Sequence, residues 1–94
     1  MSRGFYVIVY DVVSDKRRLK IAKYLESLGD RVQYSVFEVY LTQQELEKLM
    51  RKFNKLINAK EDSVRVYMLC EACRGKIEML GKGEVTEPPG VVIV

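Results

Sequence analysis

Apolar and polar residues alternate along the chain in segments of strand and helix periodicity. Residues 4–11, GFYVIVYD, are apolar or aromatic at nearly every position and contain several β-branched residues. This composition is typical of a central strand that is covered on both faces. Ser14 or Asp15 can cap a helix over residues 15–28. Gly29 can end that helix in a left-handed conformation, so the first third of the chain predicts a strand followed by a helix.

The remaining residues predict three further strands and a second helix. Residues 31–41, RVQYSVFEVYL, predict one long strand. Residues 42–45, TQQE, form a capping box. Apolar residues follow the box at helical spacing: Leu46, Leu49, Met50, Phe53, Leu56 and Ile57. Residues 63–69 alternate as a third strand, and residues 76–80, KIEML, predict a short fourth strand before Gly81.

This order of elements predicts a ferredoxin-like α+β sandwich of βαββαβ plan, formed as one domain over residues 1–94. The plan requires the long segment 31–41 to supply the second strand and part of the third. Two helices cover only one face of such a sheet, although the first strand is apolar on both faces. We therefore expect the uncovered face to pack on a second copy of the chain, giving a homodimer.

The tail over residues 84–94 predicts an extra C-terminal strand. It contains EPPG and ends in the apolar, strand-prone sequence VVIV. An exposed strand of this kind is prone to aggregation unless it pairs with a sheet edge. That edge belongs either to the same chain or to the partner chain of the dimer.

Composition narrows the class of protein. The 94 residues are 48% hydrophobic, which is more apolar material than so small a monomer easily buries and favours an oligomer. A formal net charge of +3 is weak support for an anionic partner. There is neither a secretory signal pattern nor an apolar run of membrane-spanning length, which indicates a cytoplasmic protein without a membrane partner.

The two cysteines, Cys70 and Cys73, form the motif CEAC. A zinc site needs four ligands, and a chain without histidine could supply them only if two chains shared their thiolates. A redox pair is disfavoured because such motifs usually open a helix near the start of a βαβ unit, whereas CEAC follows a late strand. The favoured interpretation is a pair of small, half-buried thiols in a loop.

Lys16, Arg17 and Arg18 lie in the first turn of the first helix, where the helix dipole disfavours cations. A phosphate bound at the start of the helix would compensate them. The alternative is that they solvate an exposed turn and pair with Asp15. Further cations extend the positive charge along both helices and into the second strand: Lys20, Arg31, Lys48, Arg51, Lys52 and Lys55.

Several motifs together resemble one family. These are YVIVYDV, with an aspartate ending the first strand, RR near the start of the first helix, LGDRVQYSVFE, and a proline-containing tail with a final apolar segment. In this order, over nearly the whole chain, they resemble the CRISPR-associated proteins of the second core adaptation type, the CRISPR-associated endoribonucleases. The resemblance implies a ferredoxin-like homodimer that exchanges its last strand. It also implies either a metal-dependent nuclease for RNA or duplex DNA in spacer acquisition and antiviral defence, or the DNA-holding subunit of the spacer integrase.

The resemblance also implies a site. Asp11 matches the metal-binding and catalytic aspartate of the family, for Mg²⁺ or Mn²⁺. Together with the cationic cluster, the resemblance gives these expected nucleic-acid contacts: Tyr10, Lys16, Arg17, Arg18, Arg31 and Phe37. The two adjacent arginines leave open which of them contacts phosphate.

The chemistry of Asp11 fits this role only if two chains contribute. A two-fold axis could bring together two Asp11 carboxylates, with water and substrate completing an octahedral site. The chain has no histidine to act as a general base, so catalysis would depend on the metal. The alternative is that Asp11 ends the strand and accepts backbone hydrogen bonds.

The aromatic residues allow similar alternatives. Tyr34 and Tyr67 are interpreted as filling the core or the dimer interface. Phe37 could stack on an unpaired base if its face opens near Asp11. Three functions therefore remain: a metal-dependent nuclease, a non-catalytic scaffold that holds duplex DNA for an integrase partner, and a ferredoxin-like regulatory module for a small ligand.

Overall fold

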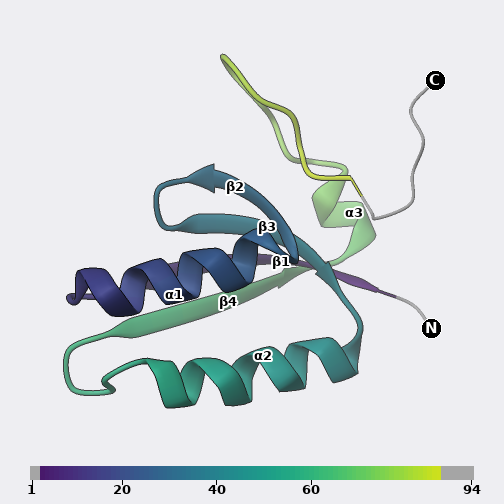
Figure 1. Ribbon diagram of the computed structural model, residues 1–94. Coiled ribbons are helices and arrows are strands. Elements are labelled where there is room, and N and C mark those ends of the chain that lie inside the picture. Colours follow the sequence, from purple (N-terminus) through teal and green to yellow (C-terminus); the bar gives the residue numbers. More distant parts are fainter. Residues whose placement is uncertain (1–2, 88–94) are drawn as a thin grey trace.

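Four antiparallel strands form one sheet in the order β2-β3-β1-β4 (Figure 1). The computed structural model describes residues 3–87. The strands are β1 (Gly4–Asp11), β2 (Gly29–Gln33), β3 (Val36–Leu41) and β4 (Ser63–Leu69). The helices are α1 (Asp15–Glu26), α2 (Gln43–Leu56) and the short α3 (Glu71–Arg74).

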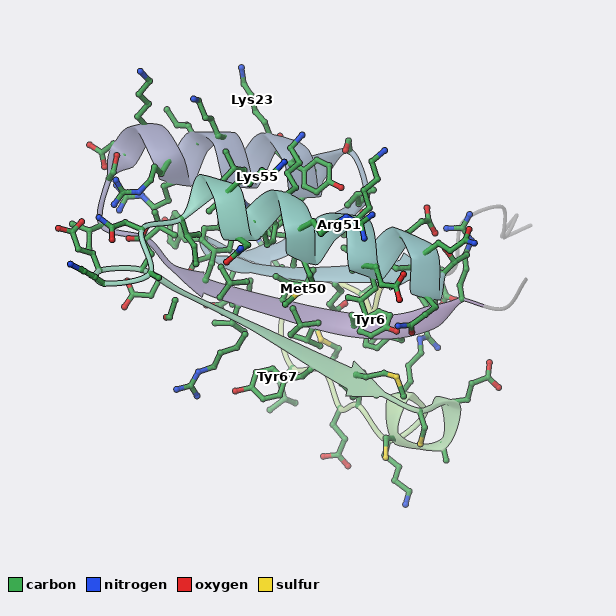
Figure 2. All side chains as sticks on the ribbon, turned by 90° about the horizontal axis from the view of Figure 1, so that it is seen from below. Tyr6, Lys23, Met50, Arg51, Lys55 and Tyr67 are labelled. Atoms are coloured by element: carbon green, nitrogen blue, oxygen red, sulfur yellow. The ribbon has the colours of Figure 1, made fainter. Side chains whose placement is uncertain are left out.

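The first six elements follow the predicted βαββαβ order, and the ferredoxin-like α+β fold is confirmed. Helices α1 and α2 lie side by side on one face of the sheet, while α3 and the segment after it lie towards the other face (Figure 2). β1 is central because it pairs with both β3 and β4. None of the helices within residues 3–87 is long and apolar enough to cross a membrane.

The core lies between the sheet and the two long helices. The side chains of Tyr6, Ile8 and Tyr10 point to this side of β1, in keeping with the two-residue period of a strand. They pack against buried residues of the helices and of β3: Ile21, Leu25, Phe37, Val39, Leu41, Leu49 and Phe53. Tyr10 and Val12, on either side of Asp11, are both buried in this core, so the end of β1 is held in place next to the start of α1.

The start of α1 is confirmed, but the predicted role of Gly29 is wrong. Ser14 is the N-cap, and its hydroxyl accepts from the backbone N–H of Arg17 at 3.4 Å. Gly29 lies in β2 without a positive φ. A Cβ there would lie 2.3 Å from the carbonyl oxygen of Glu38, so glycine allows β2 to approach β3 closely.

The prediction of one long strand over residues 31–41 is also wrong. The segment is a hairpin in which Tyr34 and Ser35 join β2 to β3. The pairing of β2 with β3 shifts register between Arg31 and Gln33. The loop contains no glycine, asparagine or aspartate, so the sequence pattern does not reveal the turn.

The second half of the fold is predicted closely as far as residue 69. Both hydrogen bonds of the capping box at the start of α2 are present between Thr42 and Glu45. β4 has the predicted bounds. The predicted strand over residues 76–80 is absent, because α3 turns the chain away from the sheet edge (Figure 1). Leu80 is accordingly 96% exposed.

The segment after α3 returns to the face of the sheet opposite the long helices. The guanidinium of Arg74 lies 5.5 Å from the ring centroid of Phe5 and 5.6 Å from that of Tyr40. The backbone N–H and the hydroxyl of Thr86 donate to Glu38 Oε1 at 3.0 and 2.9 Å. One end of this face is thus covered by the chain itself. Residues 84–87 form no strand, and the remainder of the predicted tail strand, 88–94, lies outside the described residues.

Candidate nucleic-acid interface

A pocket of about 420 Å³ gathers three of the predicted nucleic-acid contacts. Its lining includes Tyr10, Arg18 and Arg31. Asp15, Leu19, Ala22 and Tyr34 complete it. Residues from the end of β1, the first turns of α1 and the β2–β3 hairpin therefore meet at one place. Two guanidinium groups in one open pocket are suited to phosphate oxygens.

Arg18 is held in this pocket by contacts with residues next to it in the chain. Its Nη1 donates to the carbonyl oxygen of Val12 at 2.9 Å, and its other terminal nitrogen pairs with Asp15. The pairing with Asp15 was the alternative considered for the cationic cluster, and the structure contains it. Both partners of this ion pair are well exposed, so the pair is weak and Arg18 can exchange it for a phosphate.

Arg31 is positioned by an aromatic ring beneath it. Its guanidinium carbon lies 5.3 Å from the ring centroid of Phe37 and its Nη1 lies 3.8 Å from Glu26 Oε1. Phe37 itself is 0% exposed and stacks on Tyr10 with ring centroids 6.3 Å apart. The open aromatic face that base stacking by Phe37 requires is therefore missing. Phe37 belongs to the core and supports Arg31 from below.

Tyr34, and not Phe37, is the aromatic residue whose ring is exposed beside the pocket. It is 93% exposed at the tip of the hairpin, so its predicted place in the core or in a packed interface is not seen in the single chain. The hydroxyl of Tyr10 donates to the carbonyl oxygen of Tyr34 at 3.2 Å and fixes the hairpin over the pocket. The missed signal was the turn, because a side chain at the tip of a hairpin lies beyond the packed layer of the sheet.

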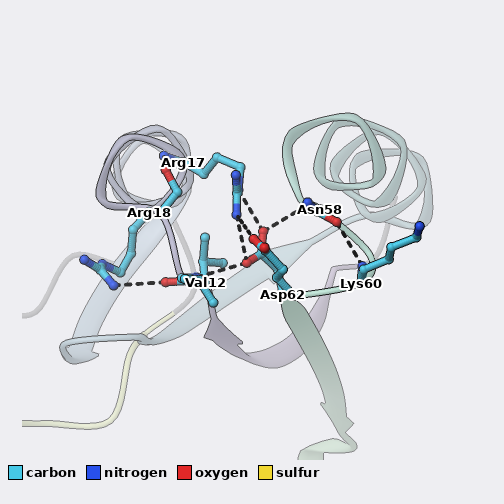
Figure 3. Close-up of polar contacts among 9 residues, drawn as sticks. Val12, Arg17, Arg18, Asn58, Lys60 and Asp62 are labelled. Atoms are coloured by element: carbon cyan, nitrogen blue, oxygen red, sulfur yellow. Dashed lines mark hydrogen bonds and ion pairs between the residues drawn. The ribbon is translucent and has the colours of Figure 1, made fainter.

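Arg17 faces away from this pocket and pairs with an acidic residue that the sequence analysis did not single out. Its Nε lies 2.9 Å from Asp62 Oδ2, and its Nη2 lies 3.2 Å from Glu61 Oε2 (Figure 3). The Asp62 side chain is 0% exposed. It also accepts from the backbone N–H of Val13 at 3.0 Å and of Asn58 at 2.8 Å. A carboxylate thus occupies the position beside the start of α1 where a phosphate was expected.

The Arg17–Asp62 pair has an electrostatic consequence. The hydrogen bond from Arg17, with those from Asn58 and Val13, lowers the pKa of Asp62 from 3.8 to about 2 against the opposing effect of burial. Asp62 is therefore charged over the whole ordinary pH range. Arg17 is a structural residue in this arrangement, which favours Arg18 as the arginine that contacts phosphate.

Asp11 lies on the other face of the sheet. It follows Tyr10 directly, but the alternation along β1 places it with Phe5, Val7 and Val9 and opposite Ser63 of β4. It is exposed and is not among the residues that line the pocket. Residues 3–87 contain no group of three cysteine, aspartate or glutamate side chains that could hold a metal. In a single chain, Asp11 is therefore an accessible metal ligand without the further protein ligands that a complete site needs.

The other cations surround the helical layer. Lys16 is exposed, and no ion pair of Lys16 is found within the described part of the chain. A second, larger depression of about 550 Å³ lies between α1 and α2 and includes Lys20, Lys23 and Lys52. Figure 2 shows Lys23, Arg51 and Lys55 on this layer. Positive charge therefore continues from the pocket across the helices.

The fold and the site together define a ferredoxin-like protein with a cationic pocket at the ends of β1 and α1. The family model of "CRISPR associated protein Cas2" matches residues 4–77. The chain belongs to this family, and the family resemblance seen in the sequence is confirmed.

Individual relatives agree with this assignment. The chain is 43% identical to the "CRISPR-associated endoribonuclease Cas2 3" of Synechocystis, with 95% of this chain and 97% of the relative covered. It superposes on the crystal structure of the hypothetical protein TT1823 from Thermus thermophilus with a TM-score of 0.79, at 40% identity and with 90% and 99% of the two chains covered. A chain of a "Partial Cas6-RT-Cas1--Cas2 complex" gives a TM-score of 0.72 at 34% identity, with 82% and 90% covered.

Proposed function

We propose that this protein is a metal-dependent endonuclease that hydrolyses phosphodiester bonds of RNA or duplex DNA and serves in the acquisition of CRISPR spacers. The observation that carries the proposal is the position of Asp11. This carboxylate stands exposed at the end of the central strand, one residue after Tyr10, whose side chain lines the cationic pocket. The description of the Synechocystis relative as an endoribonuclease supports the same activity.

The residues present fit a divalent cation only as a pair of chains. Asp11 supplies one hard oxygen ligand, and hard oxygen ligands are what Mg²⁺ and Mn²⁺ prefer. A homodimer packed through the open face of the sheet would supply a second Asp11 from the partner. A cation bound there would neutralise the charge of the phosphodiester and activate a water molecule. The chain has no histidine that could activate water as a general base.

The open face of the sheet supports such a dimer. Val7, Val9 and Val36 are only half-buried on this face, and Tyr67 is exposed beside them. Arg74 and residue 86 cover the opposite end, near Phe5. The end that carries Asp11 is thus left for a partner, and a two-fold axis there would place two carboxylates close together.

The pocket residues have separate tasks in this proposal. Arg18 and Arg31 bind phosphate oxygens of the backbone and so place the nucleic acid beside the end of β1. Tyr34 offers a ring for stacking against a sugar or an unpaired base. None of these contacts depends on base identity, so binding is tolerant of sequence.

A second function is favoured by two observations. A chain of a Cas1–Cas2 complex shares this fold at 34% identity, and the cations of the present chain extend well beyond the pocket, across α1 and α2. These features suit a scaffold that holds duplex DNA for an integrase partner without cutting it. The scaffold requires the cations but not Asp11.

A metal titration tests the nuclease. Highly purified protein is incubated with labelled RNA and with labelled duplex DNA in Mg²⁺, in Mn²⁺ and in excess chelator. The proposal predicts cleavage of at least one substrate with either metal and none with the chelator. Cleavage unaffected by the chelator would contradict metal dependence, and the absence of cleavage in every condition would leave the scaffold as the function.

A further inference from the structure

The CEAC motif opens a helix, contrary to the arrangement expected from its sequence position. Cys70 is the N-cap of α3, and Cys73 lies in the last turn of the same four-residue helix. Both side chains are exposed, so the half-buried thiols expected in a loop are not found. The motif thus begins a helix, as redox pairs do, although it follows β4 and does not open a βαβ unit.

The two cysteines are in contact through their polar atoms. The backbone N–H of Cys73 donates to Cys70 Sγ at 3.4 Å. This hydrogen bond places the Cys70 sulfur beside the backbone of its potential partner, and residues three apart in one helical turn have neighbouring side chains. The hydrogen bond also lowers the pKa of the Cys70 thiol, while the thiol of Cys70 raises the pKa of Cys73. The two thiols are therefore unequal, as an attacking and a resolving thiol should be.

A small reagent can reach Cys70. The residue lines a pocket of about 180 Å³ on the edge of the sheet, together with Met68 and Leu69 at the end of β4. Arg3 and Arg74 contribute to the same pocket. The exposed Cys70 side chain in this pocket is accessible to a low-molecular-weight disulfide.

We propose that Cys70 and Cys73 form a redox-active dithiol that exchanges with low-molecular-weight disulfides. The Cys70 thiolate attacks one sulfur of the reagent, forming a mixed disulfide and releasing one thiol. The Cys73 thiolate then attacks Cys70 Sγ, closing the intrachain disulfide and releasing the second thiol. The reagent gains two electrons and two protons, and the protein loses them.

The dithiol lies next to the residue that anchors the segment after α3 to the sheet. Arg74 follows Cys73 directly, donates to the carbonyl oxygen of Thr86 at 2.7 Å and pairs with Glu87 at 3.4 Å. Closure of the disulfide therefore fixes the short helix that anchors residues 86 and 87. This inference concerns α3 alone and does not depend on nuclease activity or on nucleic-acid binding.

Thiol exchange with glutathione disulfide tests the proposal. The reduced full chain is incubated with the reagent at neutral pH, quenched with acid, alkylated and weighed by mass spectrometry. We expect the unmodified chain to lose two hydrogen masses and both alkylatable thiols, without an accumulating adduct. Retention of both thiols, stable glutathione adducts or disulfides between chains would overturn the proposal.

Two matched variants assign the order of attack. Cys73→Ser removes the resolving thiol and should trap one glutathione on Cys70. Cys70→Ser should form its adduct several-fold more slowly, because Cys73 lacks the backbone hydrogen bond that lowers the pKa of the Cys70 thiol. Equal rates for the two variants, or no adduct on the Cys73→Ser variant, would contradict the assignment. Both positions are exposed, so thermal melting should show both variants folded.

Discussion

Arg17 and Asp62 are separated by 45 positions in the chain and form an ion pair of 2.9 Å that joins the start of α1 to the loop before β4. The carboxylate also accepts backbone hydrogen bonds from Val13 and Asn58. The pair thus connects both βα halves of the fold. It also removes one of the two adjacent arginines from the candidate phosphate site.

Asp62→Asn should lower the melting temperature at neutral pH by roughly 5 to 10 °C, because the buried partner of Arg17 loses its charge. Glu61→Gln is the matched control. It removes the exposed partner of the same arginine and should change the melting temperature by about 2 °C or less. Similar melting temperatures for the two variants would contradict the structural role of Asp62.

The same pair predicts how stability depends on acid. The pKa of Asp62 is lowered in the folded chain from 3.8 to about 2, so its contribution is fully present above 3.8 and is lost as the pH falls through about 2. Urea unfolding between pH 5 and pH 2 measures this loss. The parent should lose more stability over the interval than Asp62→Asn, and parallel curves for the two proteins would refute the prediction.

Arg18→Ala combined with Arg31→Ala should weaken binding of duplex nucleic acid and flatten its salt dependence. Each phosphate contact removed should reduce the log–log slope by about 0.9. Lys76→Ala is the control, since it removes an exposed cation that does not line the pocket. Fluorescence anisotropy over a range of salt concentrations gives the slopes. An unchanged slope in the double variant would exclude the pocket as a phosphate site.

Tyr34→Ala should weaken binding of single-stranded nucleic acid by about five-fold or more, corresponding to at least ~1 kcal/mol of stacking. Tyr34→Phe preserves the ring and should bind as the parent does. The side chain is almost fully exposed, so neither change should affect folding. Equal affinities of the Ala and Phe variants would show that the ring makes no contact.

The open face of the sheet predicts a dimer in solution. Light scattering at micromolar concentration should give twice the mass of the chain, and deletion of residues 90–94 should weaken or destabilise the dimer. A monomeric parent would remove the basis for pairing two Asp11 side chains. A truncated protein that is as dimeric and stable as the parent would contradict the exchanged tail strand.

The parts of the fold with strong local signals could be predicted from the sequence. β1 is a continuous apolar run, and α2 has both a capping box and apolar residues at helical spacing, so their positions depend on nearby residues alone. The hairpin at Tyr34 and Ser35 has no such signal, because the alternation of apolar and polar residues continues through the turn and the loop lacks glycine and asparagine. Missing the turn led directly to missing the exposure of Tyr34.

The sequence could predict individual residues of the candidate site but not the contacts between them. The motif resemblance selected Tyr10, Arg18 and Arg31, which the fold brings into one pocket. It could not separate Arg17 from Arg18, since the choice depends on Asp62, whose neighbouring residues give no indication of the pairing. Base stacking by Phe37 requires an open ring face, and only the packing of the folded chain shows that this ring is buried. Contacts between distant residues decided each of these cases.

The central claim is that Asp11 acts in cleavage and not in binding, and its amide variant tests this most directly. Asp11→Asn preserves the shape of the side chain but removes its charge, and Asp30→Asn serves as the control on an exposed strand residue. Cleavage and affinity are measured on the same highly purified samples with Mg²⁺. We expect Asp11→Asn to bind nucleic acid as the parent does and not to cleave it, while Asp30→Asn does both. Cleavage by Asp11→Asn at the parental rate would contradict the account.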